Sequence, residues 1–209
     1  MIQIAKLGVA VVASVVLLGC GGGGEDAGTG TGVRASLYLG TWSACEPLPS
    51  MRSSAIVGST KTIVVIVANR SNGLSASDTS TFYDSSDCTG LIKATVASPT
   101  VGGTLGFNGT KTVDGNTVDK VEITTPANTV YSASGDFAEG DDKFIVTFTN
   151  PDNTLNPIEI DKGYEAGTAK TIFFIDSSGQ LRIGDDDELL DSDGYPNNFF
   201  VDEFPLTRN

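Results

Sequence analysis

The sequence predicts an all-β fold. Short runs rich in β-branched and aromatic residues are separated by Gly, Thr, Ser and Asn at intervals of about ten residues, which is typical of antiparallel strands joined by turns. Apolar and polar residues alternate in 121–124 and 143–149, as in strands with one buried and one partly wet face. No long segment shows helical spacing. We therefore expect about eight to ten strands in antiparallel up-and-down order, closed into a β-barrel, with a two-sheet sandwich as the alternative.

The expected strands lie, in order, at 36–44, 54–57, 61–68, 80–83, 91–96, 104–107, 117–124, 129–134, 143–149, 171–175 and 181–184. Residues 63–67 are apolar throughout, which predicts a strand covered on both faces. Asp114-Gly115-Asn116 predicts a turn before the strand at 117. Asp176-Ser-Ser-Gly179 predicts the loop of a hairpin between the last two strands.

The first expected strand contains Leu39-Gly40-Thr41-Trp42, which resembles the glycine-x-tryptophan signature of lipocalins and other calycin barrels. In that superfamily the tryptophan closes the floor of the barrel, and an arginine after the last strand packs across its ring. The resemblance implies that Gly40, Trp42 and Arg208 form this closure, with Arg208 stacked on the indole by a cation–π contact. Arg182 is the competing candidate for the arginine.

A wider resemblance rests on three groups of residues. They are Gly40-Thr-Trp-Ser-Ala-Cys45-Glu46, then Phe82-Tyr83-Asp84 with Asp87-Cys88-Thr89, then Ile172-Phe-Phe-Ile-Asp176 with Leu181-Arg-Ile-Gly-Asp185. Together they are similar to a set of uncharacterised bacterial lipoproteins with lipocalin-like domains. The resemblance implies one lipocalin-like β-barrel domain over residues 34–209 and a disulfide between Cys45 and Cys88.

The start of the chain has the pattern of a secretory signal peptide over residues 1–19, with Lys6 ahead of the apolar run 7–18. As a helix this run would span about 18 Å, short of the roughly 30 Å hydrocarbon core, which argues against a transmembrane helix. Leu17-Leu18-Gly19-Cys20 resembles the lipobox of bacterial lipoproteins. That resemblance implies cleavage before Cys20 and acylation of its thiol and of the new amino terminus. An ordinary signal that leaves Cys20 free is the alternative.

Residues 20–33 form a glycine-rich segment too poor in apolar groups to pack, and we expect a flexible linker of roughly 20 Å between its ends. An aspartate after the lipidated cysteine would resemble the inner-membrane retention signal of lipoproteins. Gly21 stands there instead, so the outer membrane is the expected location. A three-chain lipid terminus would hold the protein in the membrane, on the periplasmic face or at the cell surface.

Cys45 and Cys88 are the two cysteines after Cys20. In an exported protein an isolated pair favours one disulfide, because the compartment is oxidising; two free buried thiols are the alternative. A bridge would close a loop of about 44 residues and stabilise the fold by about 4 kcal/mol in the chain-entropy model. Two cysteines without histidine do not make a normal zinc site, and their spacing is far from Cys-x-x-Cys.

The formal net charge is -13 and the chain has no histidine. Such an acidic surface repels nucleic acid and anionic headgroups, so neither is an expected partner. The lack of histidine removes the commonest general base and metal ligand. Motifs for a serine nucleophile elbow, a phosphate loop or a dinucleotide site are also missing, and we expect a protein that is not an enzyme, with no cofactor and no metal.

One acidic run, 185–188 with Asp191 and Asp193 before Gly194, has the ligand types that calcium prefers. The EF-hand register fails, because Leu189 would stand at the first ligand position. A solvated loop is the simpler expectation.

Two classes of function remain. The first is a non-enzymatic binding module whose barrel holds a small apolar or amphipathic ligand. The alternative is a structural or protein-interaction lipoprotein of the outer membrane, with a barrel filled by side chains and loops that contact another envelope protein. Bulky interior residues favour the alternative, and six phenylalanines are candidates for that interior. They are Phe107, Phe137, Phe144, Phe148, Phe173 and Phe174.

Overall fold

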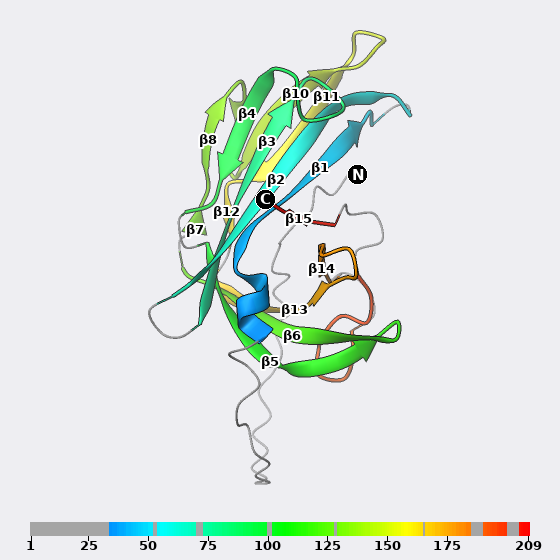
Figure 1. Ribbon diagram of the computed structural model, residues 1–209. Coiled ribbons are helices and arrows are strands. Elements are labelled where there is room, and N and C mark those ends of the chain that lie inside the picture. The colour runs from blue at the N-terminus through cyan, green and yellow to red at the C-terminus, as the bar shows by residue number, and fades with distance from the viewer. Residues whose placement is uncertain are drawn as a thin grey trace, which may run out of the picture.

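The computed structural model describes residues 34–51, 54–69, 73–99, 102–127, 129–164, 166–184, 190–199 and 205–209. It confirms an all-β fold built from antiparallel sheets (Figure 1). The predicted signal peptide 1–19, the predicted lipid-attachment residue Cys20 and the linker 20–33 lie outside the described residues, as does the 185–189 part of the acidic run.

The elements in chain order are η1 (Ser36–Tyr38), β1 (Gly40–Pro49), β2 (Ile56–Ala68), β3 (Leu74–Tyr83), β4 (Ile92–Ala97), β5 (Gly103–Val113), β6 (Asn116–Thr125), β7 (Thr129–Val130), β8 (Ser132–Gly135), β9 (Ala138–Glu139), β10 (Lys143–Thr149), β11 (Leu155–Asp161), β12 (Gly163–Tyr164), β13 (Gly167–Ile175), β14 (Leu181–Ile183) and β15 (Thr207–Arg208).

The main sheet runs in the order β14-β13-β6-β5-β3-β2-β1-β15. Leu206, the residue just before β15, also pairs with β14 at the other end of this order. Leu206 and Leu181 exchange two backbone hydrogen bonds, of 2.8 and 3.0 Å between N and O. The chain after residue 205 therefore pairs with β14 on one side and with β1 on the other.

The order departs from the predicted uninterrupted up-and-down run at two places. β4 branches from β3: Leu74–Ala76 of β3 pair with β5, whereas Thr79–Tyr83 pair with β4. Residues 126–166 then lie between β6 and β13, which are themselves neighbours in the sheet. The sequence did not reveal these insertions, because strands of similar length and pattern occur inside and outside the main sheet.

The inserted segment supplies a second layer. β9, β10 and β11 form a separate sheet, seen beside β1 to β4 in the upper part of Figure 1, and β8 extends the main sheet beyond β4. β5, β6 and β13 cross the lower part of the same view. The molecule therefore has an upper two-layered part and a lower part, joined by the long strands β1, β2 and β3.

Each part has its own apolar cluster. The lower cluster consists of Tyr38, Trp42, Val64, Ile66, Leu74, Leu105, Val121, Ile123, Phe173, Leu181 and Leu206. The upper cluster consists of Leu48, Phe82, Ala94, Val96, Tyr131, Phe144, Val146, Phe148 and Ile158. The alternation predicted for 121–124 and 143–149 holds, since Val121, Ile123, Val146 and Phe148 all point into these clusters.

Three strand predictions are corrected. The single strand expected at 129–134 is two strands, β7 and β8, which pair with different neighbours. Residues 36–38, expected to begin the first strand, form the 3-10 turn η1, and Gly40 starts β1. The separate strands expected at 54–57 and 61–68 are one strand, β2. Its 63–67 run is not covered on both faces: Val64 and Ile66 are buried, whereas Val67 is 47% exposed. β-branched residues favour a strand even on a wet face, so an unbroken apolar run overstated the burial.

Candidate functional site

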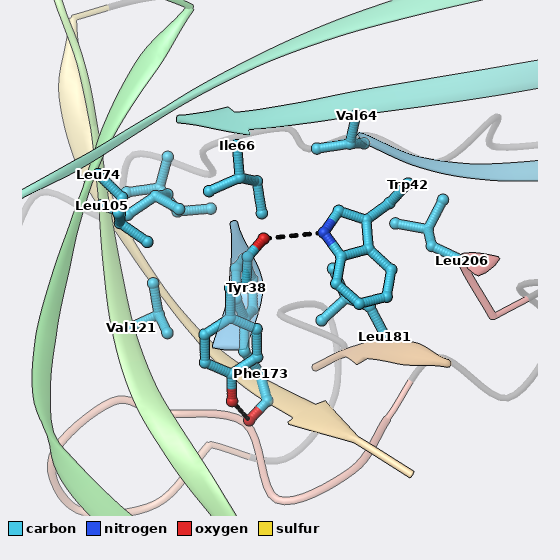
Figure 2. Packing of buried hydrophobic residues seen from close by; sticks show 11 residues of the cluster. Tyr38, Trp42, Val64, Ile66, Leu74, Leu105, Val121, Phe173, Leu181 and Leu206 are labelled. Carbon is cyan, nitrogen blue, oxygen red and sulfur yellow. Dashed lines mark hydrogen bonds between the residues drawn. The ribbon is translucent and has the colours of Figure 1, made fainter. Parts of the chain in front are cut away.

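Trp42 lies at one side of the lower cluster (Figure 2). Its side chain is 0% exposed, and its indole Nε1 donates a hydrogen bond of 2.8 Å to the carbonyl oxygen of Tyr38. Leu181, Leu206 and Val64 surround the ring in Figure 2. The turn η1 thus satisfies the polar atom that this buried side chain carries.

Arg208 lies over the ring of Trp42. It pairs directly with Trp42 in the β1–β15 ladder, and its guanidinium carbon is 4.5 Å from the centroid of the indole. Its Nη2 also donates a hydrogen bond to the carbonyl oxygen of Leu37. The structure therefore brings Trp42 and Arg208 together. Arg182, the competing candidate, instead places its Nε 3.1 Å from Asp176 Oδ2.

Gly40 lets the chain turn from η1 into β1. Its φ of 134° lies in a region that L side chains rarely adopt, and a Cβ at this position would come 3.8 Å from Arg208 Nε. All three residues that the lipocalin resemblance implied for the closure, Gly40, Trp42 and Arg208, therefore lie at one end of β1.

A polar triad that sequence reasoning missed holds the start of the domain. Tyr38 donates its hydroxyl proton to Asp119 Oδ2 at 2.6 Å, and Arg34 Nη1 lies 2.8 Å from Asp119 Oδ1. Burial, followed by the hydrogen bond with Asp119, raises the pKa of Tyr38 far above its ordinary value. Asp119 is more than 80 positions from both Arg34 and Tyr38 in the chain, and no local pattern links it to them.

A band of polar side chains separates the two apolar clusters on the inner face of β1 to β3. Glu46 faces Thr60 across the β1–β2 ladder, and burial raises the pKa of Glu46. Asp78 lies farther along, on β3, where it accepts a hydrogen bond of 2.9 Å from the Tyr131 hydroxyl. Burial raises the pKa of Asp78, against the lowering effect of its hydrogen bonds with Tyr131 and Ser98.

A hollow of about 30 Å³ lies beside Asp78, where β4 and β5 separate from β3. Ala76, Gly103, Thr125 and Tyr131 are among its lining residues. Since one water needs roughly 10–15 Å³ on this measure, the hollow has the size of a water site.

The predicted disulfide is present. Cys45 on β1 is bonded to Cys88, which lies in the loop between β3 and β4. Cys88 has a φ of 58°, and its backbone N–H donates to Ser59 Oγ on β2. The bond therefore ties this loop across β2 to the first strand, and the alternative of two free thiols is wrong.

The described end of the acidic run belongs to a segment that we name the strap, residues 190–199. Asp191 Oδ1 accepts backbone N–H bonds from Asp193 and Tyr195, and Asp191 Oδ2 is 2.6 Å from Lys111 Nζ. Burial acts to raise the pKa of Asp191, but the hydrogen bonds from Lys111 and the strap backbone outweigh it and lower the pKa. The cation beside this carboxylate is therefore a lysine of the sheet.

Among the described residues, no group of three or more His, Cys, Asp or Glu side chains is arranged to hold a metal ion. The calcium hypothesis falls largely on residues 185–189, outside the described part of the chain. Within the ranges that the structure describes, no helix is long and apolar enough to cross a bilayer.

Comparisons of the chain with family models, curated proteins and solved structures found no match. The proposed function therefore depends on the geometry of the described residues and on the sequence pattern around Cys20.

Proposed function

We propose that this chain is an envelope lipoprotein, anchored in the outer membrane by acyl chains on Cys20, whose lipocalin-like β-barrel is filled by side chains and acts as a rigid, non-enzymatic interaction module. The observation that carries the proposal is the packing of the lower cluster. Trp42, Tyr38 and Phe173 converge there from β1, η1 and β13 (Figure 2).

Closure of the barrel is supported by the backbone pairings. In the main sheet each strand pairs with the next, from β1 through β2, β3, β5, β6 and β13 to β14. Leu206 then pairs with β14, and Thr207–Arg208 pair with β1. Together these pairings support a closed ring of eight strands. Eight strands enclose a space that side chains fill or that one small ligand occupies.

A filled interior is supported by the size and burial of the side chains. Tyr38 stacks on Phe107 with ring centroids 5.6 Å apart and meets Phe173 edge-on at 5.4 Å. The hydroxyl of Tyr38 also bonds to the backbone oxygen of Phe173 at 3.1 Å. Aromatic groups that pack against one another in this way occupy the volume that a carrier would give to its ligand. The packing therefore favours the interaction protein over the small-molecule carrier.

The experiment is native mass spectrometry of protein extracted from membranes without refolding, together with titration of an apolar fluorescent probe. We expect the mass of the lipidated chain alone and no saturable probe binding. Leu105→Ala, which removes a buried side chain from the lower cluster, is the matched control that should gain probe binding. A stoichiometric co-purifying small molecule in the wild-type protein would overturn the filled-barrel proposal.

The anchor is tested separately with Cys20→Ser. We expect the variant to leave the membrane fraction after a high-salt wash, because it lacks the thiol that carries diacylglycerol. The matched control is Cys45→Ser/Cys88→Ser, which removes the other two cysteines and should remain membrane-bound. Retention of the Cys20→Ser protein in washed membranes would refute the anchor.

A further inference from the structure

The strap, residues 190–199, lies on the outer face of β5, β6 and β13, and three lysines of this face hold it. Lys111 on β5 is the most closely surrounded. Its ammonium lies 2.6 Å from Asp191 Oδ2, 2.9 Å from the carbonyl oxygen of Pro196 and 2.8 Å from Asn197 Oδ1. A fourth oxygen, the backbone carbonyl of Tyr195, is 3.5 Å away. One lysine thus binds four oxygens of the strap.

Lys120 on β6 and Lys170 on β13 hold the middle of the strap. Lys120 Nζ is 3.3 Å from Asp193 Oδ2, and Lys170 Nζ donates to the Asp193 carbonyl oxygen at 2.7 Å. Both ammonium groups also approach the Tyr195 ring, at 4.8 and 5.1 Å from its centroid. The aromatic ring therefore takes part in two cation–π contacts.

Tyr195 is the anchor of the strap. It is 3% exposed, and its hydroxyl accepts a hydrogen bond from Asn108 Nδ2 at 3.1 Å and lies 3.3 Å from Glu122 Oε1. It packs in a small apolar cluster with Val113, Val118 and Ile172, to which Phe174 and Phe199 add their rings. The outer face of the sheet thus offers an apolar patch of Val113, Val118 and Ile172 under Tyr195, with two groups that contact the Tyr195 hydroxyl and three ammonium groups nearby.

The sheet recognises the strap through side chains rather than by strand pairing. Among the described residues, the strap's bridge to the rest of the protein is Gly184 with Phe199, and its other bridge is internal, Leu190 with Pro196. The chain has 13 basic and 26 acidic residues, so three lysines against one glutamate, Glu122, on this face are a local reversal of its charge. Such a face complements a segment that carries carboxylates near an aromatic residue.

We propose that Lys111, Lys120, Lys170 and the apolar patch under Tyr195 form a docking site for an acidic, tyrosine-containing segment of a partner protein, and that the strap occupies this site as an autoinhibitory mimic of that segment. The proposal rests on the interaction function proposed above and names its surface and partner chemistry. A strap in the same chain acts at an effective concentration of about millimolar, so a partner segment binds only when it competes with or displaces the strap.

The test uses a fluorescent peptide with the sequence of residues 190–199 and a strap-release variant, Asp191→Asn/Tyr195→Ala, in the full chain. We expect polarisation to show saturable binding to the variant and at least tenfold weaker binding to the wild type. Adding Lys111→Ala and Lys170→Ala to the variant should abolish the binding, and higher salt should weaken it. The control peptide carries the same Asn and Ala replacements and should not bind.

A second measurement covers the case in which the release variant does not fold. In the wild-type protein, millimolar peptide should speed hydrogen exchange at the amides of Asp193 and Tyr195, and the control peptide should not. A folded release variant that ignores the peptide, or that binds both peptides equally, would overturn the proposal. So would binding of anionic phospholipid vesicles in place of the peptide, or dimerisation by strap exchange without peptide binding. Native mass spectrometry of the wild type tests the filled barrel independently.

Discussion

Trp42 and Arg208 show how a single pair of residues joins β1 and β15, the first and last described strands. The guanidinium of Arg208 stacks on the face of the Trp42 indole, and the indole nitrogen donates a hydrogen bond to the carbonyl oxygen of Tyr38 in η1. Because Trp42 is the chain's one tryptophan, its fluorescence reports directly on this contact.

Replacing Arg208 with alanine should cost about 0.5–2 kcal/mol of unfolding free energy, since it removes a cation–π contact. We expect urea denaturation to show this loss together with a red-shifted Trp42 emission. The matched control is Arg182→Ala, which removes a partly exposed ion pair with Asp176 and should leave the emission unchanged. Unchanged emission in Arg208→Ala would contradict the stacking.

Asp78 makes the stability of the fold depend on pH, and the direction of this dependence follows from its pKa. Burial raises its pKa, so the folded state binds the proton more strongly than the unfolded state does. Its contribution to stability is therefore complete below the unfolded pKa and is lost as pH rises through the raised folded value.

In Asp78→Asn, which cannot ionise, the loss of stability with rising pH should be smaller than in the wild type. Urea denaturation at a series of pH values from acid to neutral measures this difference. Asp87→Asn is the control, because its carboxyl is fully exposed and its pKa is lowered by hydrogen bonds from Thr89 and Ser85. If the free energy of unfolding of Asp78→Asn and of the wild type changed equally with pH, a buried Asp78 carboxyl with a raised pKa would be ruled out.

Some residue roles could be predicted and others could not. The short motif around Trp42 pointed to Arg208, and the isolated cysteines pointed to their disulfide. The triad of Arg34, Tyr38 and Asp119 had no sequence signal, because Asp119 lies on β6, far along the chain from the other two. The acidic run was visible, but its lysine partners are spread over three strands, so the sequence suggested solvent or calcium instead.

At the scale of elements, the strand at 143–149 was predicted with its observed bounds, because strict alternation marks a half-buried strand clearly. Strands β3 and β5 were predicted too short, since their Ser, Thr and Gly residues look like turn formers. β11 and β15 were not predicted: β11 contains Pro157, and β15 has two residues. Where pairing with a neighbour decides the conformation, local composition is a poor guide.

The β5–β6 hairpin offers a test of turn chemistry. Asp114 and Gly115 both have positive φ, of 49° and 77°, as two-residue hairpin loops of the mirror-image type require. Gly115→Ala should cost about 1 kcal/mol by denaturation, because the space around it is open and only backbone strain remains. Gly106→Ala, in the same hairpin but without a positive φ, is the control. A larger loss for Gly106→Ala than for Gly115→Ala would refute this account.

Two free edges of the upper part carry proline. Beyond Ser43, β1 pairs only with β2 within the described chain, and this edge carries Pro47 and Pro49. The outer edge of β11 carries Pro157. Proline cannot donate a ladder hydrogen bond, which discourages pairing with strands of other molecules.

At the scale of the whole molecule, the two apolar clusters share β1, β2 and β3. Leu48 and Trp42 lie on the same strand but in different clusters. Loss of packing in the upper part therefore loosens strands that the lower part needs, and we expect one cooperative unfolding transition.

Ile158→Ala, in the upper layer, should lower the stability by about 2–5 kcal/mol. The urea midpoint of Trp42 fluorescence, which reports on the lower cluster, should shift together with that of far-UV circular dichroism. Leu155→Ala, on the same strand but at a side chain that is 65% exposed, should change the stability by less than about 0.5 kcal/mol. An unshifted Trp42 transition in Ile158→Ala would mean that the two parts unfold separately.

Residues 206–208 come after all the other described strands, and a ribosome makes them last of these. A product truncated before Leu206 would have a β1 and a β14 with bare main-chain edges and an indole with no guanidinium above it. Bare edges recruit other chains and are readily opened to cleavage. Residues 206–208 therefore cover two strand edges at once, and a chain cut short before them is left vulnerable to proteases.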